Sequence, residues 1–375
     1  MVVRQQTEPS TIGGAETIKR YGHLFGRITD ITNISNAHIN AKKGKKEYAE
    51  IKIINQNPGF YLNEIQNSLL DHTFTTSGYR IKQIYEPKPR EIFILPYYPD
   101  RIVHHAIMQV LQPIWDRTFI YDLYSAIPGK GIHHGHYRLR DFLKDRENTR
   151  YCLKFDISKF YPTINHDILY TQIQKKIKCP ETLWLLKDVI YSVNGETNVP
   201  IGNYLSQYFS NIYLNDFDHW LKEDMQTKYY LRYCDDGVIL NGDKEYLKYL
   251  LIDIEKYLRT KLDLTLNKKT RIFKVDQQGI DFLGYREFRT YSLLRKSSAR
   301  KFKKRISSFT NHPEKYSPLH IISSVMSMYG WAKHCNSYNL VNKYLLSNEK
   351  LKEIMDRCCD DLKINNPMNT LNYYT

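Results

Sequence analysis

The segment Tyr229-Tyr-Leu-Arg-Tyr-Cys-Asp-Asp-Gly-Val-Ile-Leu-Asn241 places two adjacent aspartates, Asp235 and Asp236, within an otherwise apolar run. Apolar residues alternate with smaller or polar ones from Tyr230 to Leu240, which predicts β-strand structure. Adjacent carboxylates repel each other and destabilise a buried strand unless a cation compensates their charge. The alternative is a hairpin turn at Asp235-Asp236-Gly237, since aspartate before glycine is common in such turns. The segment therefore predicts either a cation site or a tight turn.

A second acidic residue follows an apolar strand in the segment Lys154-Phe-Asp-Ile-Ser-Lys-Phe-Tyr161, where the strand is expected from Tyr151 to Asp156. Neighbouring strands would bring Asp156 close to Asp235 and Asp236. Three carboxylates supply hard oxygen ligands for two divalent cations about 3.5 to 4 Å apart, an arrangement that catalyses nucleotide polymerisation. We therefore predict a two-metal nucleotidyl-transfer site at these three residues.

Strands and helices are expected to alternate around these two segments. A short apolar run predicts a strand at residues 92–96, and apolar spacing of helical period predicts several helices. The helices are expected over residues 99–115, 134–143, 165–177, 180–191, 203–225 and 243–261, and again after the basic segment 295–305. Strands interleaved with helices indicate the α+β fold class.

The composition favours a polyanionic partner. The chain has 55 Lys and Arg against 40 Asp and Glu, a formal charge of +15, which suits nucleic acid, although a solvated basic surface is the alternative. Many of the 31 tyrosines stand beside Lys or Arg, a mixture that can stack on bases. The six cysteines have no zinc-ligand spacing, and no signal peptide or long apolar run is seen, so we expect a cytoplasmic protein without membrane contact. The pair His104-His105 is expected at the surface or facing nucleic acid.

Several motifs, taken in their order along the chain, resemble those of reverse transcriptases. The motifs are Asp156 with Phe160-Tyr161, Ile201-Gly-Asn-Tyr-Leu-Ser-Gln207, Tyr233-Cys-Asp-Asp236, Lys268-Lys269-Thr270 and Phe282-Leu-Gly-Tyr285, preceded by the fingers-like segments Arg90 to Pro96, Asp100 to Ala106 and Gly129 to Gly131. Five ordered motifs are far more specific than any one alone. The resemblance implies a right-hand polymerase fold. Its expected parts are an N-terminal extension at 1–50, fingers at 51–150 with part of 165–205, an antiparallel palm at 151–290 and a helical thumb with a tail at 291–375.

The resemblance also implies a role for each matched residue. Asp156 and Asp235, with the backbone carbonyl of Ile157 and the supporting acid Asp236, would bind two Mg²⁺ ions, or two Mn²⁺ ions in their place. Lys269 would protonate the departing pyrophosphate, with Lys268 as the alternative. The deoxynucleoside triphosphate and the nascent base pair would contact Lys88, Arg90, Lys130, the steric-gate residue Tyr161, Ile201, Gly202 and Gln207. The primer strand would be gripped by Phe282, Leu283, Gly284 and Tyr285.

Ile201 indicates which group of reverse transcriptases the chain resembles. Most reverse transcriptases have Gln before this glycine, whereas Ile-Gly-x-x-x-Ser-Gln resembles the enzymes of diversity-generating retroelements. Those enzymes copy a template-repeat RNA into cDNA with frequent errors opposite adenine, and they work with a small basic helical accessory protein. Replacing an amide by an apolar side chain removes a polar check on base pairing, so discrimination against mismatches should fall.

Two alternatives remain open. A group II intron or retron type reverse transcriptase shares most of these motifs, although Ile201 is atypical of both. A non-catalytic RNA-binding or splicing factor could keep a polymerase-like fold for binding alone. The intact Asp156, Asp235 and Asp236 argue against that second alternative.

Overall fold

The structure is a computed structural model that describes residues 19–85 and 89–371. Packing divides the chain into two compact units, each built from two separate segments. Unit 1 comprises residues 1–117 and 161–213, and unit 2 comprises residues 118–160 and 214–375. Both units mix helices with antiparallel strands, so the α+β class is confirmed.

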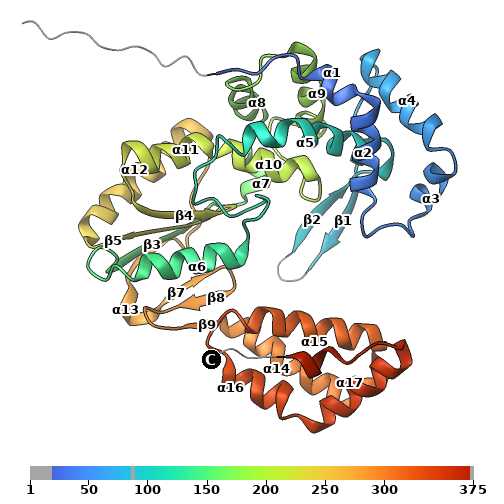
Figure 1. The fold of residues 1–375 in the computed structure, drawn as a ribbon. Helices are drawn as coiled ribbons and strands as arrows, with labels where there is room; N and C mark the ends of the chain where they lie inside the picture. Colours follow the sequence, from blue (N-terminus) through green and yellow to red (C-terminus); the bar gives the residue numbers. More distant parts are fainter. Residues whose placement is uncertain (1–18, 86–88, 372–375) are drawn as a thin grey trace, which may run out of the picture. The chain divides into compact units, whose positions relative to one another are not determined.

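In its described residues, unit 1 is mainly helical and carries one two-stranded sheet, which is cyan in Figure 1. Helix α5 is its centre, because apolar residues on several sides of α5 are buried against α1, α2 and α10. Asp30 begins α2 as an N-cap by accepting hydrogen bonds from the backbone N–H groups of Thr32 and Asn33. The elements are α1 (Phe25–Thr29), α2 (Ile31–Ala41), α3 (Ala49–Gln56), α4 (Pro58–Leu70), β1 (Arg80–Ile84), β2 (Arg90–Ile94), a π-helical turn (Tyr97–Arg101), α5 (Ile102–Trp115), α8 (His166–Gln174), α9 (Pro180–Ile190) and α10 (Tyr204–Tyr213), with α7 (Phe160–Thr163) at the unit boundary.

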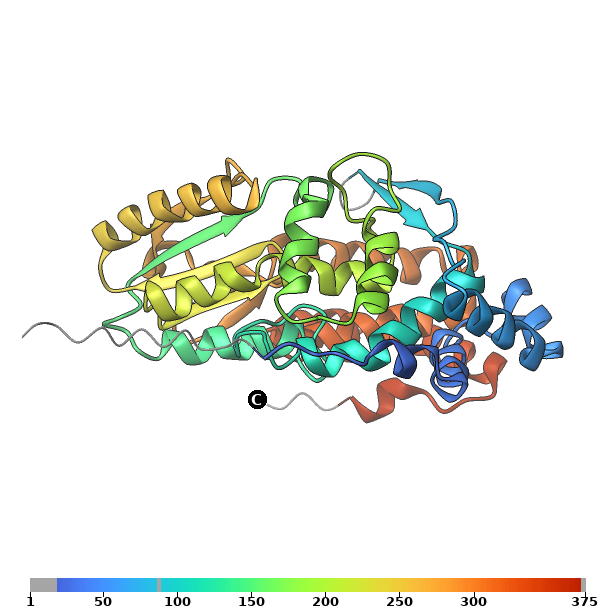
Figure 2. The ribbon, with the colours of Figure 1, turned by 90° about the horizontal axis from the view of Figure 1, so that it is seen from above.

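Unit 2 is organised around a four-stranded antiparallel sheet in the order β4-β5-β3-β6. Leu139, Phe142 and Leu143 of α6 pack on one face, and α12 covers the other, running alongside β3 in Figure 2. Side chains alternate between the two faces along each strand, so both helices bury apolar residues. The elements are α6 (Ile132–Leu143), β3 (Tyr151–Asp156), α11 (Asn215–His219), a π-helical turn (Trp220–Asp224), β4 (Tyr229–Tyr233), β5 (Asp236–Asn241), α12 (Lys244–Leu262), β6 (Arg271–Lys274) and α13 (Val275–Gln278).

A smaller sheet and a helical bundle complete unit 2. Strands β7, β8 and β9 form a three-stranded antiparallel meander. The bundle has its own apolar core, to which Phe302, Phe309, Val325 and Met355 belong, and α15 and α17 lie side by side in Figure 1. The elements are β7 (Ile280–Phe282), β8 (Tyr285–Glu287), β9 (Ser292–Leu294), α14 (Lys296–Asn311), α15 (Pro318–Ala332), α16 (Tyr338–Val341), a π-helical turn (Asn342–Leu346) and α17 (Glu349–Leu362), with 3₁₀ turns at Pro313–Lys315 and Pro367–Thr370.

Most expected elements are present, with two differences. The segment expected as one helix at 203–225 is broken into α10, α11 and a π-helical turn. The run from Tyr230 to Leu240 forms two strands, β4 and β5, because a turn intervenes at Cys234-Asp235. The division into fingers, palm and thumb at residues 50, 150 and 290 remains a prediction, since the compact units are divided elsewhere.

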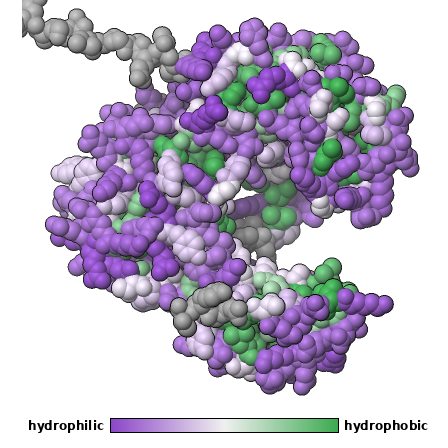
Figure 3. All heavy atoms as spheres, in the orientation of Figure 1, coloured by the Kyte–Doolittle hydropathy of each residue, from purple (hydrophilic) through white to green (hydrophobic). Residues whose placement is uncertain are grey.

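The surface seen in Figure 3 is mostly hydrophilic, with small separate apolar patches. Among the helices in the described part of the chain, none is long and apolar enough to cross a bilayer. All six cysteines are free thiols.

Candidate functional site

Strands β3 and β5 place two of the predicted acids opposite each other. Asp156 and Asp236 are register partners at the end of this antiparallel pair. Asp235 precedes Asp236 in the turn that joins β4 to β5, and its backbone carbonyl accepts a hydrogen bond of 3.3 Å from the N–H of Ile157. Unit 2 therefore gathers Asp156, Ile157, Asp235 and Asp236, which are far apart in sequence, at one end of its sheet.

The turn itself consists of Cys234 and Asp235, because Tyr233 and Asp236 pair across it. Cys234 has a φ of +56°, which is uncommon for a residue other than glycine and is held only where surrounding structure enforces it. The alternative turn at Asp235-Asp236-Gly237 is therefore displaced, since Asp236 and Gly237 already belong to β5.

Gly237 has a packing role in this hairpin. It lies opposite Phe155, and a Cβ atom at Gly237 would be only 2.2 Å from Cζ of the Phe155 ring. Phe155 is fully buried and stacks on Tyr230, with ring centroids 6.4 Å apart. Because Gly237 has no side chain, it leaves the space that the buried Phe155 ring occupies beneath the two aspartates.

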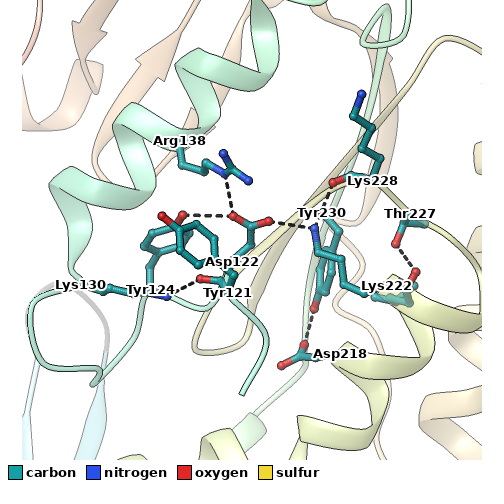
Figure 4. A network of polar contacts seen from close by, with 11 residues as sticks. Tyr121, Asp122, Tyr124, Lys130, Arg138, Asp218, Lys222, Thr227, Lys228 and Tyr230 are labelled. Atoms are coloured by element: carbon teal, nitrogen blue, oxygen red, sulfur yellow. Dashed lines mark hydrogen bonds and ion pairs between the residues drawn. The ribbon is translucent and has the colours of Figure 1, made fainter. Parts of the chain in front are cut away.

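Arg232 supports the turn from inside the protein. Its fully buried guanidinium donates to both carboxylate oxygens of Asp218, at 2.7 and 2.5 Å, and its Nη1 donates to the carbonyl oxygen of Cys234 at 2.6 Å. The hydroxyl of Tyr230 donates to the same carboxylate at 2.6 Å (Figure 4). Because Asp218 is also fully buried, loss of either partner would leave an uncompensated charge. Sequence analysis missed this pair, although an arginine inside an apolar strand was a visible signal.

Burial and the two neighbouring acids oppose the ionisation of Asp236. Burial raises the pKa of Asp236, Lys154 lowers it by charge and by a hydrogen bond of 3.1 Å, and Asp156 and Asp235 raise it again. The net result is a pKa of about 6. Negative charge at this end of the sheet therefore exceeds what Lys154 compensates, which favours a cation.

The donor chemistry suits Mg²⁺, which prefers carboxylate and carbonyl oxygens. Asp156 and Asp235, with the carbonyl of Ile157 and the supporting acid Asp236, are the residues that would hold it. Within residues 19–85 and 89–371, however, no three His, Cys, Asp or Glu side chains are gathered closely enough to enclose a metal ion. The donor types and their repulsion fit the ion, and its binding remains a proposal.

Lys268 and Lys269 lie in a turn that is tied to the same strand. The N–H of Asn267 donates to the carbonyl oxygen of Asp156 at 2.7 Å, and the side-chain oxygen of Asn267 accepts from the N–H of Lys269 at 3.1 Å. Both lysine side chains are exposed. Both lysines therefore follow directly after Asn267, the residue bonded to Asp156. Which of the two would protonate the pyrophosphate stays open.

Lys130 belongs to a polar network in unit 2 that Figure 4 shows. Its Nζ donates to the carbonyl oxygen of Tyr121 at 2.6 Å and lies 4.1 Å from the centroid of that ring. The neighbouring Asp122 accepts from Arg138 at 2.8 Å and from Lys222 at 2.9 Å. Burial lowers the pKa of Lys222, and the charge of Asp122 opposes that shift. These contacts anchor the loop that carries Lys130, whose contact with a triphosphate is untested.

The remaining nucleotide-binding candidates lie in unit 1 or outside the described residues. Arg90 is exposed at the start of β2, and the hydroxyl of Tyr161 lies 3.3 Å from that of Ser210. Gln207 is exposed on α10. Lys88 lies outside the described residues. Their part in nucleotide binding stays a prediction.

Ile201 and Gly202 are held against strand β2. The carbonyl oxygen of Ile201 accepts a hydrogen bond of 2.9 Å from the N–H of Phe93. Gly202 has a φ of +120°, and a Cβ atom there would be 2.8 Å from the carbonyl oxygen of Phe93. Close approach to β2 thus requires glycine at 202 and fixes the backbone of the residue before it.

The predicted primer grip is a tight hairpin between β7 and β8. Phe282 pairs with Tyr285, so Leu283 and Gly284 form a two-residue turn, both with positive φ. Phe282 and Tyr285 are buried, and the hydroxyl of Tyr285 donates to the carbonyl oxygen of Trp331 at 3.0 Å. If this hairpin meets a primer, the turn residues must make the contact, because the flanking rings belong to the core.

The pair His104-His105 was expected at the surface or facing nucleic acid, and the structure departs from the surface placement. His104 is buried on α5, and His105 is half-buried and lies against the ring of Tyr204, with centroids 4.8 Å apart. Helix α5 is enclosed on more sides than its apolar pattern indicated.

Comparison with known proteins decides the family. Residues 87–286, more than half of the chain, match the family model described as reverse transcriptase (RNA-dependent DNA polymerase). The chain belongs to the reverse transcriptase family. This reverse transcriptase contains Asp156, Asp235 and Asp236 within the matched range, and its enzyme class, RNA-directed DNA polymerase, is the one expected from the sequence.

Two relatives and two solved structures are similar to this reverse transcriptase. Protein YkfC of Escherichia coli (strain K12) is 27% identical over 282 residues, which covers 58% of this chain and 74% of that protein. The putative COX1/OXI3 intron 2 protein of Saccharomyces cerevisiae is 19% identical over 304 residues, which covers 60% of this chain but 34% of that protein. The apo telomerase structure of Candida tropicalis has a TM-score of 0.49 at 13% identity, covering 83% of this chain and 63% of that chain. Candida albicans telomerase, in complex with a TWJ fragment of telomeric RNA, has a TM-score of 0.47 at 12% identity, covering 84% and 71%.

Proposed function

We propose that this reverse transcriptase makes error-prone cDNA, with errors concentrated opposite adenine, from a template-repeat RNA of a diversity-generating retroelement. The observation that carries this proposal is Ile201 at the position before Gly202. An amide there could report base-pair geometry by hydrogen bonding, and an isoleucine side chain cannot. The bond between Ile201 and Phe93 fixes this backbone, so the apolar side chain occupies a defined place.

We propose that the carboxylates of unit 2 bind the metal ions that catalyse nucleotidyl transfer. Asp156, Asp235 and the Ile157 carbonyl would hold two Mg²⁺ or Mn²⁺ ions, with Asp236 in support. Bound ions of this kind lower the pKa of a primer hydroxyl and stabilise the leaving pyrophosphate. Lys269 would donate the proton to pyrophosphate, and Lys88, Arg90, Lys130 and Gln207 would contact the incoming nucleotide.

Selection and handling of substrates involve three further proposals. Tyr161 would exclude a ribose 2′-hydroxyl by its bulk, so that deoxynucleotides are preferred. The Leu283-Gly284 turn, flanked by Phe282 and Tyr285, would contact the primer strand. A small basic helical accessory protein would help to bind the RNA. The free thiols suit a cytoplasmic location.

A second candidate is a group II intron type reverse transcriptase, which the match to a yeast intron protein favours. Primer extension on a defined RNA, followed by sequencing of the cDNA, separates the two. The proposal expects misincorporation opposite template adenine to exceed that opposite the other three bases. A uniform, low error rate at all four bases would favour the intron type. Binding of RNA without any extension would instead point to a non-catalytic splicing factor.

A further inference from the structure

A pocket of about 230 Å³ lies within unit 1, beside the segment that carries Gly202. Its lining comes from four places in the chain: the turn between α2 and α3, Leu95 after β2, the segment 101–105 that spans the π-helical turn and the start of α5, and residues 202–207 around the start of α10. The polar lining residues are Lys45, Arg101, His104, His105, Asn203, Tyr204 and Gln207, and the lining contains no Asp or Glu. A concave site that offers cations and neutral polar groups but no carboxylate suits an anion.

The two cations of this pocket are half-buried and unpaired. Neither Lys45 nor Arg101 forms an ion pair or a side-chain hydrogen bond with another residue in the described part of the chain. Burial lowers the pKa of Lys45, and the nearby charge of Arg101 lowers it further. Two like charges that repel each other in a partly desolvated place destabilise the protein until an anion neutralises them.

Two histidines add neutral hydrogen-bonding groups. Burial and then the charges of Arg101, Lys45 and Lys43 lower the pKa of His105 to about 4, and burial lowers that of His104 to about 3. His104 is only 2% exposed, and its Nε2 has no hydrogen-bond partner within the described residues. A buried polar atom without a partner, in a residue that lines a pocket, is an unfavourable arrangement unless a ligand or water meets it.

We propose that this pocket binds a phosphate group of a substrate, with Lys45 and Arg101 as the charged contacts and His104 and Gln207 as hydrogen-bonding groups. Phosphate is the anion that fits, because a reverse transcriptase handles it in both nucleic acid strands and free nucleotides. The inference rests on the family and on the proposed cDNA synthesis. It assigns phosphate binding to Lys45, Arg101 and His104 of unit 1, beside Gln207, which is already proposed to contact the nucleotide.

The test compares two double variants of the full chain that lose equal charge. Lys45→Gln with Arg101→Gln removes both pocket cations, whereas Lys46→Gln with Arg27→Gln removes two exposed cations outside it. Binding is measured without polymerisation, using a short single-stranded RNA in one arm and inorganic pyrophosphate in the other. Loss of phosphate binding is therefore read independently of cDNA synthesis or its errors.

If the pocket holds a strand phosphate, the pocket variant weakens RNA binding on the order of tenfold at moderate salt. The slope of log K against log salt then falls by about 1.4, or about 0.7 for each of two contacts. If it holds a free nucleotide, pyrophosphate binding weakens instead while RNA binding matches the control. Equal binding of both probes by the two double variants overturns the proposal.

Thermal unfolding of the ligand-free variants guards against a purely structural explanation. Removal of one of two repelling cations should leave the melting temperature unchanged or raise it, because no ion pair is lost. A lower melting temperature in both Lys45→Gln and Arg101→Gln, with the same decrease in RNA affinity, would mean that these residues support the fold and would also overturn the proposal.

Discussion

Nη1 of Arg232 donates a hydrogen bond of 2.6 Å to the carbonyl oxygen of Cys234, the first residue of the turn that presents Asp235. Through Nε and Nη2, the same guanidinium binds both carboxylate oxygens of Asp218. Cys234, a strained residue with positive φ directly before the predicted metal ligand Asp235, is thus fixed by a buried ion pair. Arg232 acts through the backbone and is a positioning residue.

Arg232→Lys should lower kcat for primer extension while leaving KM for the nucleotide nearly unchanged. A lysine keeps the charge but cannot bond Asp218 through two nitrogens and reach Cys234 as well. Removal of the charge in Arg232→Met should destabilise the fold by about 3 kcal/mol, as measured by urea unfolding. A folded Arg232→Lys protein with unchanged kcat would show that the turn needs no such support.

Asp235→Asn should abolish RNA-templated primer extension, with at least about a hundredfold loss of rate in Mg²⁺. RNA affinity should change little, because the substitution removes one charge from a site of repelling acids. The matched control is Asp253→Asn, an exposed acid on α12. Extension by Asp235→Asn at the control rate would remove this residue from the site.

Ile201→Gln should reduce misincorporation opposite template adenine more than opposite the other bases, since it restores a polar amide where most reverse transcriptases have one. Ile201→Leu, which changes shape but not polarity, is the control and should retain the original error spectrum. The measurement is deep sequencing of cDNA made on one defined RNA. If both variants keep the original spectrum, Ile201 does not determine fidelity.

Asp236→Asn should stabilise the metal-free protein above pH 6. The pKa of Asp236 is about 6 in the fold and about 3.9 in an unfolded chain, so the protonated form favours folding. The stabilising contribution of that proton is complete below about pH 4 and is lost as the pH rises through 6. The variant should therefore match the parent at pH 4 and exceed its unfolding free energy by about 3 kcal/mol at pH 7.5, because each pKa unit corresponds to about 1.36 kcal/mol. An equal difference at both pH values would contradict this account.

Gly237→Ala should destabilise the fold by about 1 to 3 kcal/mol, because the new methyl group meets the Phe155 ring. Gly330→Ala is the matched control, since Gly330 lies within α15 and its added Cβ would meet nothing within 4 Å. Alanine also favours a helix over glycine, so the control should be neutral or slightly stabilising. Equal melting temperatures for the two variants would show that the Phe155 ring shifts freely.

Strand β3 and the acids at the end of β5 could be predicted from sequence because both depend on local pattern. Strand β3 has the predicted bounds, Tyr151 to Asp156, since its apolar alternation is uninterrupted. The antiparallel pairing that brings Asp156 opposite Asp236 confirms the expected neighbourhood of the two segments.

The turn, the broken helix and the buried ion pair could not be predicted in the same way. The glycine in Asp235-Asp236-Gly237 suggested a turn, but its place is set by the ring of Phe155, which comes from another strand. The apolar period across 203–225 continues through the breaks between α10, α11 and the π-helical turn. Arg232 and Asp218 lie on different elements, β4 and α11, so no periodic pattern in the sequence indicates that they are in contact.

Strand β3 lies between β5 and β6, and both of these partners come later in the chain. During synthesis on the ribosome, β3 must therefore wait with both edges open until Asn241 and then Lys274 have been made. Open edges of an apolar strand pair readily with other chains. A nascent or truncated chain that ends before β5 should consequently be prone to aggregate, and expression should tolerate C-terminal shortening only beyond β6.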